Sequence, residues 1–181
     1  MTSRHTPAPD PVGLLSLDQW SELPEDELGR SELQEGVLIV SPRPRRRHQD
    51  TLGGLYTVVQ AALPSDLHAI MEIDVIIDAG FPPTVRVPDL VVVAAEAGEP
   101  LHAHDVVLAV EIVSPGSARL DTVTKLSEYA EAGIRHYWII RPDRTLSSFT
   151  LVDGEYVGVT HAIGTFTATE PFPVTVDLTR L

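Results

Sequence analysis

The chain has 181 residues, 43% of them hydrophobic, and 13 lysines and arginines against 26 acidic residues, which gives a formal net charge of −13. That length suggests one domain with a sizeable core, and the acidic balance argues against broad electrostatic wrapping of nucleic acid. The absence of cysteine excludes disulfides, zinc–thiolate sites, iron–sulfur clusters and a cysteine nucleophile, and the absence of a long apolar run or a signal core predicts a cytoplasmic, non-membrane protein.

The first thirty residues predict a tail followed by short helices. Residues 1–15 are expected to be a disordered tail, because they contain several prolines and no periodicity, which leaves 16–181 as a single domain. The acidic stretch 16–30 predicts one or two short helices, with a cap at Ser16 or Asp18 and an interruption near proline 24.

A strand, a basic run and a helix follow. Residues 31–42 are typical of an apolar strand after a glycine turn, and residues 43–47, RPRRR, form the one basic run of the chain. Residues 48–64 have apolar side chains at helical spacing up to Pro64.

The middle of the chain is rich in predicted strands. Residues 68–80 alternate partly and end in a glycine turn, and residues 85–95 and 105–115 are nearly continuous apolar runs that indicate buried strands. Residues 118–133 are the clearest helix, with apolar side chains at helical spacing and Gly133 as its end.

The last third predicts strands only. Residues 136–142 form a further strand, residues 146–159 a hairpin with an Asp-Gly turn, and residues 165–178 a last strand. The three central strands should form an antiparallel meander, and the sheet should become mixed where the 118–133 helix returns the chain. The fold class is therefore α/β or α+β, and without a glycine-rich phosphate loop it is not a doubly wound nucleotide fold.

Two acids stand in the apolar central strands. Asp89 follows Pro88 at the start of one strand, and Glu111 lies between Val110 and Ile112 in the next. Buried carboxylates on neighbouring strands repel each other unless a cation lies between them, and a hard divalent cation such as Mg²⁺ provides one. In the alternative, Asp89 caps a turn and Glu111 faces solvent on an edge strand.

Lys125 is the only lysine of the chain and lies on the helix that follows the Glu111 strand. Because that helix begins near the end of the strand, the long side chain could reach back toward the carboxylates. Asp121 precedes Lys125 by four residues on the same helix face, which is also the spacing of an ordinary surface ion pair.

Several of these segments together form a recognisable pattern. They comprise a Pro-Asp, a Val-Glu-Ile-Val-Ser-Pro strand, an Asp-x-x-x-Lys-x-x-x-Tyr helix, an Ala-Gly turn and a Tyr-Trp strand, with SELQEGVLIVSPRP and a histidine upstream. Over about residues 16–145 the chain resembles the Uma family of restriction endonucleases, within the PD-(D/E)XK nuclease superfamily. The resemblance implies a restriction-endonuclease-like mixed central sheet with flanking helices, here with a C-terminal β-hairpin extension.

The resemblance also implies an activity and a catalytic set. The expected activity is a Mg²⁺- or Mn²⁺-dependent endonuclease that hydrolyses phosphodiester bonds in nucleic acid, with DNA as the expected substrate. Asp89 and Glu111 match the two acids of the superfamily motif and would hold the metal. The motif's lysine normally follows two residues later, where this chain has Val113; Lys125 matches the lysine that some members carry on the following helix.

Further residues would support the site or bind the substrate. Glu32 matches the family's N-terminal glutamate, His48 matches a histidine at the start of the second helix, and Asp121 would hold Lys125; for His48 a capping or core role is equally open. The candidates for phosphate contacts are arginines, with a solvated loop as the alternative for the basic run: Arg43, Arg45, Arg46, Arg47 and Arg119.

Two questions remain open at the level of sequence. The resemblance implies a homodimer, but no spacing in the chain indicates one. The alternative function is a catalytically inactive nuclease fold that serves as a binding or dimerisation module, with strand edges of residues 145–181 pairing between subunits.

Overall fold

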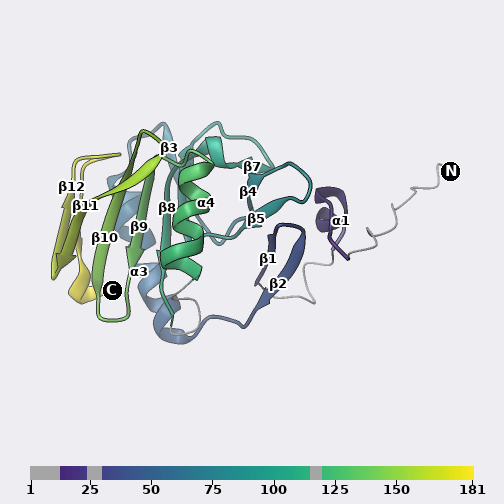
Figure 1. Ribbon diagram of the computed structural model, residues 1–181. Coiled ribbons are helices and arrows are strands. Elements are labelled where there is room, and N and C mark those ends of the chain that lie inside the picture. Colours follow the sequence, from purple (N-terminus) through teal and green to yellow (C-terminus); the bar gives the residue numbers. More distant parts are fainter. Residues whose placement is uncertain (1–12, 24–29, 115–119) are drawn as a thin grey trace.

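The protein is seen here in a computed structural model that describes residues 13–23, 30–114 and 120–181, apart from the side chains of residues 120, 121 and 159. Most of the expected tail and the segments 24–29 and 115–119 therefore lie outside the description. A large sheet carries a helix on each face, and a smaller sheet lies beside it (Figure 1). No helix in the described ranges is long and apolar enough to cross a membrane.

The large sheet has six strands in the order β11-β10-β9-β8-β6-β3. Neighbouring strands are antiparallel except β8 and β9, which are parallel. The prediction of a sheet that becomes mixed after the Glu111 strand is therefore confirmed. The strands are β3 (Leu67–Met71), β6 (Leu90–Ala94), β8 (Val106–Ile112), β9 (His136–Ile140), β10 (Thr145–Val152) and β11 (Glu155–Ile163).

The two faces of this sheet are covered by different helices. Helix α3 (Arg46–Ala62) packs on one face, where Leu55 shares a core with Val110. On the other face lies α4 (Lys125–Glu131), preceded by a π-helical turn, and its Tyr129 shares a second core with Ala109. Because side chains alternate along a strand, Glu111 lies on the same face as Ala109, the α4 face.

The smaller sheet has five strands in the order β2-β1-β5-β4-β7. A separate two-stranded sheet packs its apolar side chains against α3. The remaining elements are β1 (Arg30–Gln34), β2 (Val37–Ser41), β4 (Val75–Asp78), β5 (Thr84–Arg86), β7 (Leu101–His102), β12 (Thr165–Ala168), β13 (Val174–Asp177), helix α1 (Leu17–Ser21) and 3₁₀ turns at Ala103–Asp105 and Leu178–Arg180.

Two predicted strands are each divided between the sheets. The segment 68–80 breaks after β3 at Glu72, which has a positive φ of 49°, and the segment 85–95 breaks between β5 and β6 at Pro88. The two breaks lie together, because the Glu72 N–H donates to the Asp89 carbonyl at 3.2 Å. Proline has no N–H for a sheet ladder, which favours the break at that position. The junction of the two sheets therefore falls at Asp89.

Two other segments that were predicted as single strands are hairpins. Residues 31–42 belong to the β1–β2 hairpin, which turns at Glu35 and Gly36, both with positive φ. Residues 165–178 form the β12–β13 hairpin. In both cases the turn residues are mostly polar, glycine or proline, and each hairpin is short enough to be mistaken for one strand. The helix at 48–64 and the Asp153-Gly154 turn are confirmed, as is the cap at Ser16.

Candidate active site

Asp89 and Glu111 lie opposite each other on neighbouring strands. Leu90 pairs with Val110 in the antiparallel β6–β8 pair, so the two acids occupy the next position along it. Each is 1% exposed, and Glu111 lies on the face that α4 covers. Asp89 Oδ2 accepts the Ile112 N–H at 2.6 Å, which joins the two strands at this point. The alternative of a solvent-facing Glu111 on an edge strand is wrong, since β8 is a central strand.

Lys125 extends from helix α4 to Glu111. It is the first residue of α4 and is 2% exposed. Its Nζ lies 2.8 Å from Glu111 Oε1 and 2.9 Å from Glu32 Oε1. One turn later, the Tyr129 hydroxyl donates to the same Glu111 oxygen at 3.0 Å. The structure therefore brings the helix lysine to the strand acid, as a displaced lysine requires.

Glu32 faces the lysine and is held by three donors. Besides Lys125, it accepts the Val87 N–H at 3.1 Å and Arg86 Nη1 at 3.1 Å. Arg86 is fully buried, and its remaining N–H groups form a bidentate pair with Glu128 on α4, at 2.7 and 2.6 Å. Glu32 and Arg86 together tie the smaller sheet to the helix that carries the lysine.

Sequence reasoning missed Arg86 and Arg30, which both belong to this cluster. Arg86 could have been recognised from the sequence, because it is a charged residue inside the largely apolar run TVRVP. Arg30 could not, because its neighbours in the sequence are polar and glycine. In the structure, Arg30 Nη1 lies 2.5 Å from Asp89 Oδ1, and its Nη2 donates to the Val87 carbonyl and lies 3.8 Å from Glu111 Oε2.

His48 lies at the start of α3 and contacts Asp89 from the opposite side. Its Nε2 is 3.2 Å from Asp89 Oδ2, and its Nδ1 is buried without a hydrogen-bond partner in the part of the chain that the structure describes. The hydrogen bond to Asp89 raises the pKa of His48 above its usual value despite partial burial. His48 therefore supplies positive character to one side of Asp89.

For Asp89 and Glu32, the neighbouring positive groups lower the pKa by more than burial raises it. Burial alone raises the pKa of Asp89, but the hydrogen bond with His48 and the charge of Arg30 bring that pKa below its usual value. In the same way, Lys125 and Arg86 lower the pKa of Glu32 against burial. Burial and the charge of Glu111 raise the pKa of Tyr129 well above its usual value, so its hydroxyl stays protonated and remains a donor.

The remaining predicted site residues lie around the start of α3 or outside the described residues. Arg43 and Arg45 to Arg47 are exposed, and Arg47 Nη2 donates to the Pro142 carbonyl at 2.6 Å. This hydrogen bond places the β9–β10 turn, with Arg141 and Arg144, beside the basic run. Arg119 and the side chain of Asp121 lie outside the described part of the chain, so the support expected from Asp121 stays a prediction.

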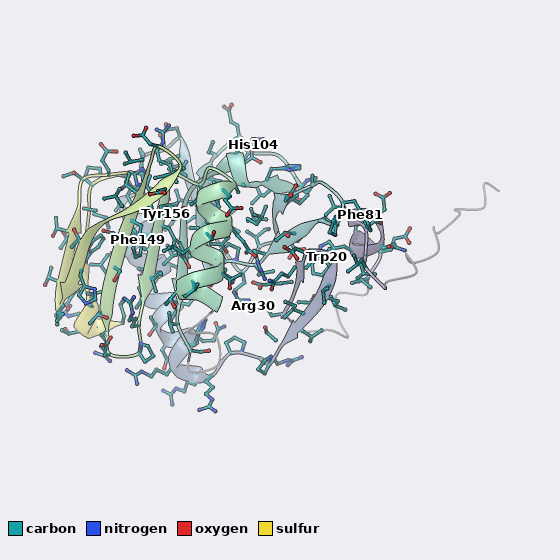
Figure 2. All side chains as sticks on the ribbon, in the orientation of Figure 1. Trp20, Arg30, Phe81, His104, Phe149 and Tyr156 are labelled. Carbon is teal, nitrogen blue, oxygen red and sulfur yellow. The ribbon has the colours of Figure 1, made fainter. Side chains whose placement is uncertain are left out.

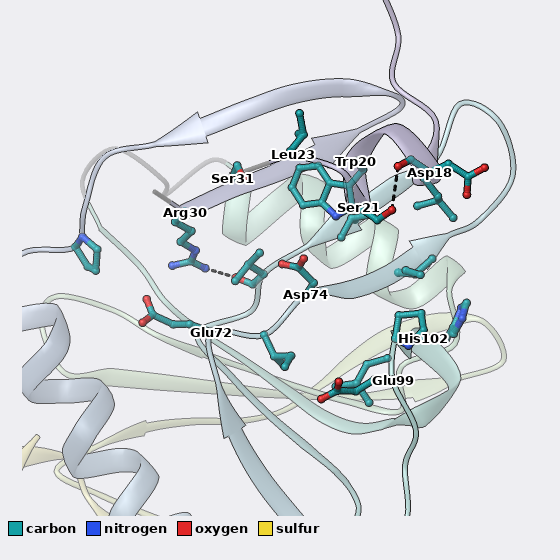
Figure 3. Close-up of a pocket in the computed structure, with 18 of the residues that line it drawn as sticks. Asp18, Trp20, Ser21, Leu23, Arg30, Ser31, Glu72, Asp74, Glu99 and His102 are labelled. Atoms are coloured by element: carbon teal, nitrogen blue, oxygen red, sulfur yellow. Dashed lines mark hydrogen bonds between the residues drawn. The ribbon is translucent and has the colours of Figure 1, made fainter. Parts of the chain in front are cut away.

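A pocket of about 1200 Å³ adjoins the cluster, and Arg30 and Val87 form part of its wall (Figure 3). Trp20 of helix α1 also lines this pocket. The lining of the pocket contains both signs of charge, with the basic Arg30 and Arg43 and four acids: Asp18, Glu72, Asp74 and Glu99.

The donor set suits a hard divalent cation only in part. Among the described residues no group of three or more acids or histidines is arranged around one point. However, Asp89 Oδ1 and Glu111 Oε2 both face a single positive group, the guanidinium of Arg30. Mg²⁺ is commonly held by one or two carboxylates, with water and substrate phosphate as its other ligands. Two carboxylate oxygens that share a cation meet that requirement.

Comparisons with known proteins identify a family and a shared fold. A family model described as Uma2, "Putative restriction endonuclease", matches residues 17–179. A crystal structure described as "a putative nuclease belonging to DUF820" from Anabaena variabilis is similar, with a TM-score of 0.69 and 19% sequence identity, and the alignment covers 92% of this chain and 96% of that one. At that identity the likeness shows a shared fold. A search of curated proteins finds no match.

Proposed function

The chain belongs to the Uma2 family of restriction endonucleases, and we propose that it is a divalent-metal-dependent endonuclease that hydrolyses phosphodiester bonds, with DNA as its expected substrate. The observation that carries this proposal is the convergence of Asp89, Glu111 and Lys125 from two strands and a helix. The match of the family model over nearly the whole chain supports the same activity.

Asp89 and Glu111 would hold the metal, Mg²⁺ or Mn²⁺, through the oxygens that now face Arg30. When bound, such a metal polarises a phosphoryl oxygen and lowers the pKa of a coordinated water. One oxygen of Glu111 is fixed by Lys125 and Tyr129, so the other points toward Arg30. These contacts set the orientation of the carboxylate before any substrate arrives.

Lys125 would act on the reacting phosphate. Its ammonium group is held between Glu111 and Glu32, so it presents a fixed positive charge beside the acid pair. That charge can orient the attacking water or stabilise the negative charge that develops on the phosphoryl oxygens. Glu32 and Arg86 act through Lys125, because they hold the amine and the helix in place and do not face the acid pair.

Nucleic acid as the substrate is supported by the distribution of arginines. Apart from the half-buried Arg30 and the buried Arg86, most described arginines belong to the α3 start, the β9–β10 turn and the C-terminal turn. The β9–β10 turn contacts both of the other segments, through Arg47 and the Pro142 carbonyl and through Arg144 and the Thr179 carbonyl. Because His48 of the same α3 start reaches Asp89, this basic surface lies next to the acid pair. A strongly acidic chain can in this way present a local positive surface to phosphates.

A cleavage assay tests the proposal. Supercoiled plasmid and single-stranded DNA are incubated with Mg²⁺, Mn²⁺ or EDTA, and Asp89→Asn, Glu111→Gln and Lys125→Arg are compared with the wild type. We expect metal-dependent cleavage that falls at least about 100-fold in each variant. Lys125→Arg is included because it keeps the charge but replaces a compact amine with a planar guanidinium.

Glu131→Gln is the matched control, since Glu131 is an exposed acid on the same helix as Lys125. It should cleave as the wild type does. Wild-type rates in the Glu111→Gln variant, or cleavage in EDTA, would contradict the proposed mechanism.

The second candidate, an inactive binding module, is favoured by the observation that both acids already have protein cations beside them. Titration calorimetry separates the two functions. A catalytic protein should bind Mn²⁺ or Mg²⁺, and an inactive module should bind neither metal while still retaining nucleic acid.

A further inference from the structure

The guanidinium of Arg30 lies between the two acids of the candidate active site. It contacts Asp89 Oδ1 at 2.5 Å and approaches Glu111 Oε2 at 3.8 Å. A guanidinium stays protonated at any ordinary pH, so Arg30 holds a permanent positive charge at this position. Figure 2 shows Arg30 between α4 and the β1–β2 hairpin.

A cation at this position is required by the geometry of the acids. Asp89 and Glu111 face each other across an antiparallel strand pair and are almost completely buried, so two unpaired negative charges there would repel strongly. Lys125 neutralises the Oε1 side of Glu111 and contacts Glu32, not Asp89. Asp89 Oδ1 and Glu111 Oε2 therefore share the guanidinium of Arg30.

Resting on the function proposed above, we infer that Arg30 is a built-in counter-ion of the acid pair that competes with the divalent cation for the same two oxygens. Asp89 Oδ1 and Glu111 Oε2 cannot hold a metal while the guanidinium occupies the space between them. The apparent affinity for metal is then reduced by the fraction of time that Arg30 is in place.

Arg30 has room to leave the acids. Its side chain is 18% exposed, whereas those of Asp89 and Glu111 are 2% exposed, and it forms part of the wall of the adjoining pocket. Glu72 lines the same pocket and offers another partner for the displaced charge (Figure 3). The buried Arg86 lacks this freedom, because its guanidinium is fixed on both sides by Glu32 and Glu128.

Titration calorimetry with Mn²⁺, in the absence of nucleic acid, tests the inference without any measurement of cleavage. Arg30→Met keeps much of the stem of the side chain and removes the charge. We expect it to bind Mn²⁺ about tenfold more tightly than the wild type or better, since the metal displaces nothing. In EDTA the same variant should melt at a lower temperature than the wild type, and Mn²⁺ should raise its melting temperature by more.

Arg135→Met is the matched control, because it removes the same charge at an exposed position before β9 that is not among the residues lining the pocket. It should bind Mn²⁺ as the wild type does. An equal gain in both variants would overturn the inference, because it would reflect general electrostatics. An unchanged or weaker affinity in Arg30→Met would overturn it as well.

Two further measurements keep the outcomes distinct. If Arg30→Met does not fold, Arg30→Gln replaces it, since the amide can still donate to the Val87 carbonyl. In the Arg30→Met background, Asp89→Asn should abolish binding, and retained binding would overturn the inference. Binding of Mn²⁺ by the wild type and Arg30→Met with equal affinity removes only this inference, whereas binding by neither protein removes the proposed metal dependence too.

Discussion

Replacement of Lys125 is expected to lower the stability of the protein strongly. The side chain is buried and contacts two buried carboxylates, Glu111 and Glu32. Lys125→Met leaves both acids short of a cation and should lower the free energy of unfolding by about 3–5 kcal/mol. Urea unfolding in EDTA measures this effect.

The double variant Lys125→Met/Glu111→Gln supplies the check. Because it removes one of the two uncompensated negative charges, it should recover part of that decrease, as residues in contact are not additive. Additive effects would mean that the amine and the carboxylate do not interact in solution.

The lowered pKa of Glu32 makes the stability of the protein depend on pH. The pKa of this carboxyl in the folded protein lies below the ordinary value of 4.5, so the unfolded chain binds the proton more readily. The stabilisation is complete above the unfolded-state pKa and is lost as the pH falls through the folded-state pKa. The stability difference between the wild type and Glu32→Gln should therefore be greatest near neutral pH and shrink below about pH 4. Urea unfolding in EDTA across this range measures it, and a constant difference would contradict the assignment.

At the scale of single residues, the sequence identified side chains that are unusual for their surroundings. Asp89 and Glu111 stood out because a carboxylate in an apolar strand requires a partner, and Lys125 because the chain has no other lysine. Arg30 could not be found in this way, because its partners are 59 and 81 residues away and nothing beside it in the sequence is apolar.

At the scale of elements, the β1–β2 hairpin positions both Arg30 and Glu32, and its turn depends on Gly36. This residue has a φ of 77°, and a Cβ there would lie 2.9 Å from the Leu14 Cβ and 3.2 Å from the Pro82 Cβ. Gly36→Ala should therefore destabilise the protein by about 1–3 kcal/mol.

Gly53→Ala is the matched substitution, and it is expected to stabilise the protein where Gly36→Ala destabilises it. Gly53 lies exposed inside α3, and a Cβ there would meet nothing within 4 Å. Alanine should stabilise the helix by about 0.5–1 kcal/mol. Thermal melts of the two variants, run together, test both expectations, and equal shifts would show that the turn places no special demand on Gly36.

The elements were predicted best where one period extends through the whole segment. The helix at 48–64 and the strand at 105–115 were found for that reason. The breaks at Glu72 and Pro88 were not predicted, because the apolar pattern continues past them while the chain passes from one sheet to the other. Those breaks place the acid pair at the junction of the sheets.

At the scale of the whole molecule, the arginines near the start of α3 are expected to make nucleic-acid binding depend on salt concentration. Arg141 and Arg144 lie on the β9–β10 turn, which Arg47 contacts through the Pro142 carbonyl. Replacing both by glutamine should reduce the slope of log Kd against log salt by about one unit for each phosphate that the protein no longer neutralises. Fluorescence anisotropy with a labelled oligonucleotide in EDTA measures the slope.

Arg135 is the control for this experiment. It is exposed and precedes β9, whereas Arg141 follows the same strand at its other end. Arg135→Gln should leave the slope unchanged, and an equal change in both variants would indicate that only net charge matters. The homodimer expected from the family resemblance remains a prediction that sedimentation of the same samples can test.

The fold class and the unusual positions of Asp89, Glu111 and Lys125 could be predicted from the amino-acid sequence, because hydrophobic periodicity and the environment of a charge within its own segment are local information. The family resemblance came from the motifs of these same segments. Which cation faces which acid could be seen only in the folded protein. The buried network joins Arg30, Glu32 and Arg86 to residues far away in the sequence, and such pairings depend on how the two sheets and α4 come together rather than on any local pattern.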